Sequence, residues 1–125
     1  MSKRVLVVDD SMLMRKMISD CLIDGGWEVV AQAANAQEAV ELYGHCNPNA
    51  VTLDIVMPGS DGMRALEQIR RIDSRAKVVV VSALNQTKLI SEAIRKGATD
   101  FITKPFLPKQ LQRTLDGCLE VSLGA

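Results

Sequence analysis

Val5-Leu-Val-Val-Asp9-Asp10, near the N-terminus, is an apolar run that ends in two adjacent acids. Two further apolar runs end in polar groups, because Val51-Thr-Leu-Asp54 ends in an acid and Val78-Val-Val-Val-Ser82 in a hydroxyl. A fourth segment, Asp100-Phe-Ile-Thr-Lys104-Pro105, ends in a lysine before proline. Continuous apolar runs are typical of strands buried on both faces of a parallel sheet. Because the carboxyl ends of parallel strands share one edge, we predict that three carboxylates, a hydroxyl and an ammonium group meet there.

Short apolar runs alternate with longer segments of helical period along the chain, which is the pattern of repeated βα units. We predict strands at Arg4–Asp9, Glu28–Ala33, Ala50–Asp54, Lys77–Ser82 and Asp100–Thr103. Each strand is followed by a helix whose apolar residues form a stripe that we expect to face the core. The five stripes are Met14, Met17, Ile18, Cys21 and Leu22; Ala36, Ala39, Val40 and Tyr43; Ala65, Leu66 and Ile69; Leu89, Ile90, Ala93 and Ile94; and Leu111, Leu115, Cys118 and Leu119. Asn35-x-x-Glu38 resembles a capping box and indicates a helix start.

The composition of the strands also predicts their order in the sheet. The first and fourth strands are the most apolar, whereas the second contains Gln32 and the fifth contains Asp100 and Thr103. Since edge strands are mixed in character, this favours the order 2-1-3-4-5. The predicted fold is therefore a doubly wound, flavodoxin-like α/β domain, a five-stranded parallel sheet with five helices distributed over both faces. Its winding reverses between strands 1 and 3, where ligands bind in folds of this kind.

The composition places further limits on the protein. The chain has 125 residues, of which 47% are apolar. We therefore expect residues 1–125 to form a single domain with one core. Fifteen basic and fifteen acidic residues cancel, so neither nucleic acid nor a membrane is an expected partner. Only four apolar residues lie between Arg4 and Asp9, too few for the core of a signal peptide. We therefore expect a cytoplasmic protein.

The acids at the predicted sheet edge suit a magnesium ion. Magnesium binds about six oxygens and usually keeps several waters, so one or two carboxylates are sufficient protein ligands. Asp10 and Asp54 can supply these directly, and Asp9 can hold a coordinated water. The metal would also offset the repulsion among the acids, since two like charges about 4 Å apart repel by about 4 kcal/mol at an effective dielectric of roughly 20.

A carboxylate at this edge can also accept a phosphoryl group as a covalent nucleophile, forming an acyl phosphate. Such transfer depends mostly on positioning and charge neutralisation, for which Mg²⁺, the Lys104 ammonium and the Ser82 hydroxyl are suited. Each feature alone has an ordinary structural explanation: an Asp-Asp pair caps a helix, a serine ends a strand, and Lys-Pro forms a loop. Four such features at successive strand ends together favour a phosphoryl-transfer site.

The motifs that carry a family resemblance extend over essentially the whole chain. They are Val7-Val-Asp-Asp-Ser11, Asp54-x-x-Met57-Pro58-x-x-x-Gly62, Ser82-Ala83 and Asp100-Phe101-x-x-Lys104-Pro105-Phe106. With these motifs the chain resembles the receiver domain of two-component response regulators. It is particularly similar to the single-domain chemotaxis regulators that bind the flagellar motor switch.

The resemblance implies a role for each residue at the sheet edge. Asp54 would be phosphorylated from the phosphohistidine of a histidine kinase, with Lys104 contacting the phosphoryl group. Asp9 and Asp10 would hold Mg²⁺ together with Asp54 and the backbone carbonyl of Val56. Such a protein is a phospho-acceptor that assists only its own phosphorylation and dephosphorylation, and not an enzyme that turns over substrates.

The resemblance also implies a conformational switch. Ser82, Ala83 and Phe101 match the hydroxyl, small and aromatic switch positions of the family, and Pro105 matches a position that follows a cis peptide bond. The Ser82 hydroxyl would bond to the phosphoryl group, and this would draw the loop after strand 4 inward and vacate space for the Phe101 ring. The surface formed by helix 4, strand 5 and helix 5 would then bind an effector, such as a motor switch or an output domain. We expect a monomer, with phosphorylation-dependent dimerisation as the alternative.

Two departures from the family pattern have predictable effects. Phe101 lacks the phenol hydroxyl of the tyrosine found in many chemotaxis members, so a partner contact that needs this hydroxyl is missing. Val56 and Leu84 are apolar at positions where family members often have polar side chains that can hold an attacking water. We therefore expect a long-lived phosphoryl group.

Three rival interpretations remain from the sequence. An aspartate-nucleophile phosphohydrolase uses a similar set of groups, but its acidic pair comes last in the chain, whereas Asp9-Asp10 comes first here. A degenerate receiver that serves only as an interaction module usually lacks an acid, the hydroxyl or the lysine, and all are present. The third is the N-terminal receiver of a longer regulator with a DNA-binding or enzymatic output domain. Nucleotide binding is not indicated, because neither glycine-rich phosphate-binding motif is present.

Overall fold

The central sheet is parallel and has the order that the sequence predicts. The computed structural model describes residues 2–83 and 85–124. Its five strands lie in the spatial order β2 (Glu28–Ala33), β1 (Arg4–Val8), β3 (Ala50–Asp54), β6 (Val78–Ala83) and β7 (Asp100–Lys104). β6 and β7 are thus the fourth and fifth strands of the predicted 2-1-3-4-5 order. The buried β1, β3 and β6 lie inside, and the more exposed β2 and β7 form the edges.

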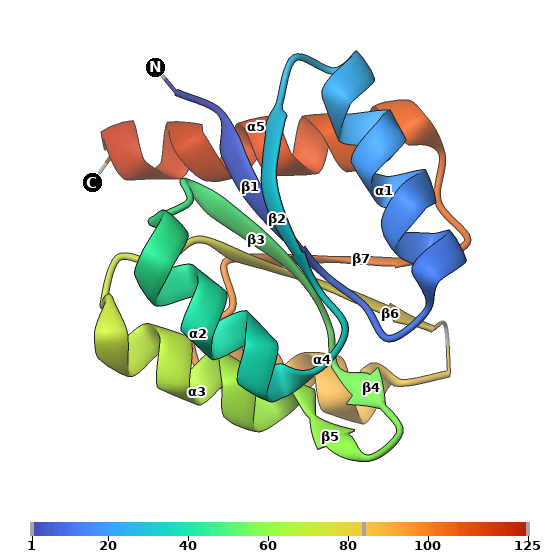
Figure 1. Cartoon of the computed structure of the whole chain (residues 1–125), viewed down its shortest axis with the longest axis vertical. Helices are drawn as coiled ribbons and strands as arrows, with labels where there is room; N and C mark the ends of the chain where they lie inside the picture. The colour runs from blue at the N-terminus through green and yellow to red at the C-terminus, as the bar shows by residue number, and fades with distance from the viewer. Residues whose placement is uncertain (1, 84, 125) are drawn as a thin grey trace.

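Helices cover both faces of this sheet (Figure 1). α1 (Met12–Asp24) and α5 (Pro108–Gly124) lie on one face, and α2 (Ala36–Cys46), α3 (Gly62–Ile72) and α4 (Thr87–Arg95) lie on the other. This arrangement confirms the doubly wound α/β fold. None of the helices in the described part of the chain combines the length and apolar character needed to cross a membrane.

The core has two halves, one on each side of the sheet, because alternate side chains of a strand point to opposite faces. On β1, Val5 and Val7 belong to the half that contains residues of α1 and α5. Leu6 and Val8 belong to the half that contains residues of α2, α3 and α4. All four are at most 1% exposed, so β1 is fixed from both sides. This holds the acids that follow it at a defined place.

Side-chain caps fix where the helices begin. Asn35 Oδ1 accepts a hydrogen bond from the Glu38 amide at 2.9 Å, and Glu38 Oε1 accepts one from the Ala34 amide at 2.8 Å. This is close to the reciprocal pattern of a capping box and confirms the helix start predicted there. The Ser11 hydroxyl caps α1 in the same way, accepting from the Met14 amide at 3.2 Å.

A short antiparallel ribbon after β3 has no counterpart in the sequence prediction. It pairs β4 (Val56–Met57) with β5 (Ser60–Asp61) across a turn at Pro58 and Gly59. Gly59 has φ +74°, which glycine adopts without steric cost. The ribbon returns the chain to Asp61, whose carboxylate caps α3 by accepting from the Arg64 amide at 3.2 Å.

Gly62, the first residue of α3, lies against the backbone of Asp54. A Cβ atom added at Gly62 would lie 2.6 Å from the backbone oxygens of both Asp54 and Ile55. Only a residue without a side chain permits this approach, so α3 begins directly under the end of β3. The glycine at the end of the motif Asp54-x-x-Met57-Pro58-x-x-x-Gly62 is therefore required by steric contact with the backbone.

Two residues of the predicted apolar stripes are not in the core. Met17 is 52% exposed and Ile94 is 42% exposed, so the prediction that they pack inside is wrong. On α1 the buried apolar positions are Ile18 and Leu22, which lie about one turn apart, and Met17 is displaced from Ile18 by about 100° around the helix axis. Ile94 follows the fully buried Ala93 in the same way.

We predict that Gly62→Ala lowers the free energy of unfolding by at least about 2 kcal/mol, because the added methyl group must push apart the backbone of α3 and β3. Urea denaturation followed by circular dichroism measures this change.

Gly44→Ala is the matched control. Gly44 lies within α2, and a Cβ there would meet nothing within 4 Å, so this variant should be more stable by about 0.5–1 kcal/mol. Equal stability of the two variants would contradict the steric explanation.

Candidate functional site

The carboxyl ends of β1 and β3 bring three carboxylates together. Val8 pairs with Leu53 in the sheet, so the residues that follow, Asp9 and Asp54, lie side by side. One carboxylate oxygen from each of Asp9, Asp10 and Asp54 lies within 4.8 Å of those of the other two. Asp9 and Asp54 are buried, whereas Asp10 is exposed. The predicted meeting of these acids is therefore present in the structure.

Lys104 supplies the positive charge of this cluster. Its Nζ lies 3.0 Å from Asp9 Oδ2 and 3.3 Å from Asp54 Oδ2. Lys104 is the last residue of β7 and pairs with Ala83 on β6, so its side chain reaches across the end of β6 to the acids beyond. A long, flexible side chain on the edge strand makes this possible.

Burial is the main influence on Asp54. Burial raises the pKa of this carboxyl group, and the charge of Asp9 raises it further. The Lys104 ammonium and the Val56 amide, which donates to Asp54 Oδ1 at 3.1 Å, act in the opposite direction but do not cancel the rise in pKa. Ionised Asp54 is therefore under-compensated, and an additional cation beside it would stabilise the charged form.

The pKa of Lys104 responds to the same environment. Burial alone would lower it, but the hydrogen bond to Asp9 and the charges of Asp54 and Asp9 outweigh burial and raise the pKa above its ordinary value. Lys104 is therefore protonated at neutral pH. It can act as a fixed cation for an anionic group that approaches Asp54.

The local structure holds Asp9 and leaves Asp10 free to bind. Asp9 Oδ1 accepts from the Ser11 amide at 2.9 Å, and its backbone carbonyl accepts from Arg15 Nη1 at 2.7 Å. Within the described parts of the chain, Asp10 makes no side-chain hydrogen bond or ion pair. Two buried oxygen ligands beside one open carboxylate form a donor set that suits a hydrated, hard divalent cation.

Ser82 lies at the end of β6, where the sequence placed it, but its hydroxyl is already engaged. Ser82 Oγ donates to Gln86 Oε1 at 2.5 Å, and Ser82 is fully buried. No hydrogen bond between the Ser82 hydroxyl and the acids is found among the described residues. Sequence reasoning missed Gln86, because no pattern relates a glutamine four residues later to the strand-end serine.

The other predicted switch residues lie close to this edge. The Lys104–Pro105 peptide bond is cis, as expected. Phe101 is on the edge strand β7 and is 44% exposed, and Ala83 ends β6 beside Lys104. Leu84, whose side chain we expect to hold no attacking water, lies outside the described residues.

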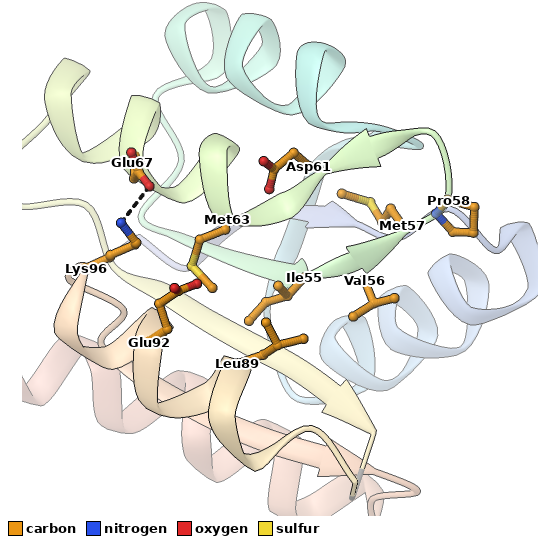
Figure 2. Close-up of a pocket in the computed structure, with 10 residues that line it drawn as sticks. All are labelled: Ile55, Val56, Met57, Pro58, Asp61, Met63, Glu67, Leu89, Glu92 and Lys96. Carbon is orange, nitrogen blue, oxygen red and sulfur yellow. Dashed lines mark ion pairs between the residues drawn. The ribbon is translucent and has the colours of Figure 1, made fainter.

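A groove of about 550 Å³ opens between the β4–β5 ribbon and α4, and the residues that directly follow Asp54 in the chain are part of its lining. Figure 2 shows Leu89 of α4 pointing toward Ile55 and Val56, so α4 and the segment after Asp54 both line the groove. Lys96 and Glu67 form an ion pair of 2.9 Å that ties the end of α4 to α3. The residues that line the groove are Ile55, Val56, Met57, Pro58, Asp61, Met63, Glu67, Leu89, Glu92 and Lys96.

Comparison with known proteins gives consistent matches. The family model of the response regulator receiver domain matches residues 5–116. The chemotaxis protein CheY of Thermotoga maritima is 46% identical over 93% of this chain and 97% of its own length, and that of Bacillus subtilis is 47% identical over 93% and 94%. CheY in the crystal structure of the CheX-CheY-BeF3-Mg+2 complex from Borrelia burgdorferi superimposes with a TM-score of 0.84, with 37% identity and coverage of 92% of this chain and 88% of that one.

We predict that millimolar Mg²⁺ raises the free energy of unfolding of the wild-type protein by about 1–3 kcal/mol, because a cation bound only to the folded state stabilises it. Asp10→Asn should lose most of this gain. In the absence of Mg²⁺ the variant should be at least as stable as the wild type, since one of three like charges is removed.

Asp20→Asn is the control for this measurement. Asp20 is an exposed acid of α1 that pairs with Lys16 at 3.0 Å, far along the helix from the cluster, so this variant should keep the full magnesium effect. Thermal or urea unfolding at several Mg²⁺ concentrations distinguishes the cases. An undiminished effect in Asp10→Asn would contradict its role as a ligand.

Proposed function

The chain belongs to the family of response regulator receiver domains, and on this premise we propose that it is the phosphorylation-activated switch of a chemotaxis-type two-component system. Its relatives include CheY proteins, which it matches over nearly their whole length. We take residues 1–125 to act as a single receiver domain in the cytoplasm. The observation that carries the proposal is a buried carboxylate, Asp54, held 3.3 Å from a lysine ammonium beside two further acids.

The proposed reaction is transfer of a phosphoryl group to Asp54. A carboxylate oxygen of Asp54 attacks the phosphorus of a phosphohistidine, the P–N bond breaks, and the imidazole leaves with the bonding electron pair and takes up a proton. The product is an acyl phosphate. Because this transfer requires mainly positioning and neutralisation of charge, the Lys104 ammonium beside Asp54 supports the assignment.

The acid cluster supports a resident Mg²⁺ ion. Asp9, Asp10, Asp54 and the backbone carbonyl of Val56 would hold it. When bound, the ion supplies positive charge to the phosphoryl oxygens and relieves the repulsion among the acids. The protein's own residues supply the rest: Lys104 neutralises the group from the other side, and the Ser82 hydroxyl is the donor that senses it.

The proposed output is a change in the surface formed by α4, β7 and α5. Bonding of the Ser82 hydroxyl to the phosphoryl group draws the loop after β6 inward, which the small side chain of Ala83 permits, and the exposed ring of Phe101 moves into the space that is vacated. A swing from 1:99 to 99:1 between two states requires about 5.5 kcal/mol. A few charge-assisted hydrogen bonds supply an energy of that order.

The partners follow from this assignment. The phosphodonor is a histidine kinase, and the effector is a protein that binds the altered surface, either a flagellar motor switch or an output domain. A CheX-type protein is a further candidate partner, because CheY from Borrelia burgdorferi is found in a complex with CheX. We propose that the protein is monomeric before phosphorylation and performs no turnover of other substrates.

We predict that acetyl phosphate with Mg²⁺ adds one phosphoryl group to the wild-type protein and none to Asp54→Asn. Intact-protein mass spectrometry under neutral conditions measures the addition. Omission of Mg²⁺ should reduce it strongly, because the negative charges of the acids then repel the phosphodonor.

Asp61→Asn is the matched control, since Asp61 is the acid that caps α3 close by and asparagine is an equally good cap. It should be labelled like the wild type. A label that survives Asp54→Asn, or no label in the wild type, would defeat the proposed function.

We also predict a phosphoryl lifetime of minutes or longer for the isolated protein with Mg²⁺. Val56 is apolar and 43% exposed beside the acceptor, so its side chain offers no hydrogen bond to an attacking water. Val56→Asn should shorten the lifetime several-fold, measured as loss of phosphoprotein after removal of acetyl phosphate. A wild-type lifetime of seconds would contradict this prediction.

A further inference from the structure

Gln86 accepts hydrogen bonds from two adjacent residues of the switch segment. Its Oε1 receives the Ser82 hydroxyl at 2.5 Å and the Ala83 backbone amide at 3.1 Å. The backbone amide of Gln86 in turn donates to the Ala83 carbonyl at 3.2 Å. Two donors from successive residues thus converge on one oxygen atom, which closes the turn between β6 and α4.

The Ser82 hydroxyl cannot serve two acceptors at once. A serine hydroxyl carries a single proton and donates one hydrogen bond. Ser82 is fully buried, so the hydroxyl has no bulk water to exchange with. A phosphoryl group on Asp54 would therefore have to displace Gln86 Oε1 as the acceptor of this hydrogen bond. The phosphoryl group is the stronger acceptor of the two, since hydrogen bonds to ionised oxygens are about twice as strong as those between neutral groups.

We propose that Gln86 is a positioning residue whose carboxamide oxygen takes the place of a phosphoryl oxygen in the unphosphorylated protein. It holds the Ser82 hydroxyl and the Ala83 amide in the resting state and competes with the phosphoryl group for them. This inference rests on the proposed function of Asp54 as phospho-acceptor. The resting contact itself, however, is a feature of the unphosphorylated protein and can be measured there.

The same contact connects the phosphorylation site to α4. Gln86 immediately precedes α4, and its carbonyl accepts the Ile90 amide at 3.0 Å in the first turn. Release of the Gln86 side chain removes two of the three hydrogen bonds that join Gln86 to the end of β6, and the bond from its backbone amide to the Ala83 carbonyl remains. The other end stays tied to α3 by the Lys96–Glu67 ion pair. α4 is thereby held by fewer hydrogen bonds at its N-terminal end, where Leu89 borders the groove with Val56 (Figure 2).

The first test is titration of the protein with beryllofluoride and Mg²⁺, which together mimic a phosphoryl group, followed by NMR of the backbone amides. Gln86→Ala and Gln86→Met both remove the acceptor oxygen, and the methionine keeps most of the volume. Both should bind beryllofluoride about tenfold more tightly than the wild type, because two competing hydrogen bonds are lost. Asn85→Ala, an exposed residue of the same turn, is the control and should bind like the wild type.

A double-mutant cycle separates competition from a general loosening of the turn. In a Ser82→Ala background the hydroxyl is gone, so Gln86→Ala should improve beryllofluoride binding by about threefold or less. A gain of about tenfold in both backgrounds would show that Gln86 acts only through the flexibility of the turn, and this would overturn the proposal.

Hydrogen exchange in the unphosphorylated protein gives a readout that does not depend on the phospho-acceptor. The Ala83 amide should exchange severalfold faster in Gln86→Ala and Gln86→Met than in the wild type. If the wild type binds beryllofluoride and the variants change neither the affinity nor the exchange of the Ala83 amide, the role of Gln86 is refuted. The proposed function would stand in that case. Absence of beryllofluoride binding in the wild type would refute the proposed function and the competition with it.

Discussion

Two buried carboxylates share one lysine ammonium, and the rest of the site depends on this arrangement. Asp9 and Asp54 are each at most 6% exposed, and ionised groups so far from water are costly unless they are paired. Lys104 contacts both, at 3.0 and 3.3 Å. One cation beside two acids, with Asp10 as a third, leaves the cluster with excess negative charge. The fold thus builds an edge that favours a further cation and, with that cation, an anionic phosphoryl group.

The sheet topology makes this arrangement possible. The strands that carry the acids are neighbours at the centre of the sheet, whereas the lysine comes from the edge strand β7, with β6 between them. The lysine must therefore pass over the end of β6, close to where Ser82 and Ala83 lie. Gly62 allows α3 to start directly against the backbone of Asp54. The charged groups, the Ser82 hydroxyl and the start of α3 therefore all lie at the same few strand ends. A change at one of these strand ends consequently affects its neighbours.

The proposed switch depends on a limited supply of hydrogen-bond donors at the end of β6. The Ser82 hydroxyl has one proton, and in this state Gln86 holds it. A response to phosphorylation needs two states that differ in their contacts with the phosphoryl group, and an internal acceptor provides the resting one. Because Gln86 stands directly before α4, exchange of one acceptor for another changes the hydrogen bonds at the start of this helix.

The sequence by itself determined the order of the strands, the edge where the acids and Lys104 meet, and the capping box at Asn35 and Glu38. These follow from local patterns, since apolar runs, strand-end residues and caps depend on near neighbours in the chain. Only the tertiary structure decided that Asp10 is open while Asp9 and Asp54 are buried, that Met17 lies outside the core, and that Gln86 holds Ser82. Side-chain direction and partner choice depend on how helices pack against the sheet, and sequence periodicity does not specify this packing to within one residue position.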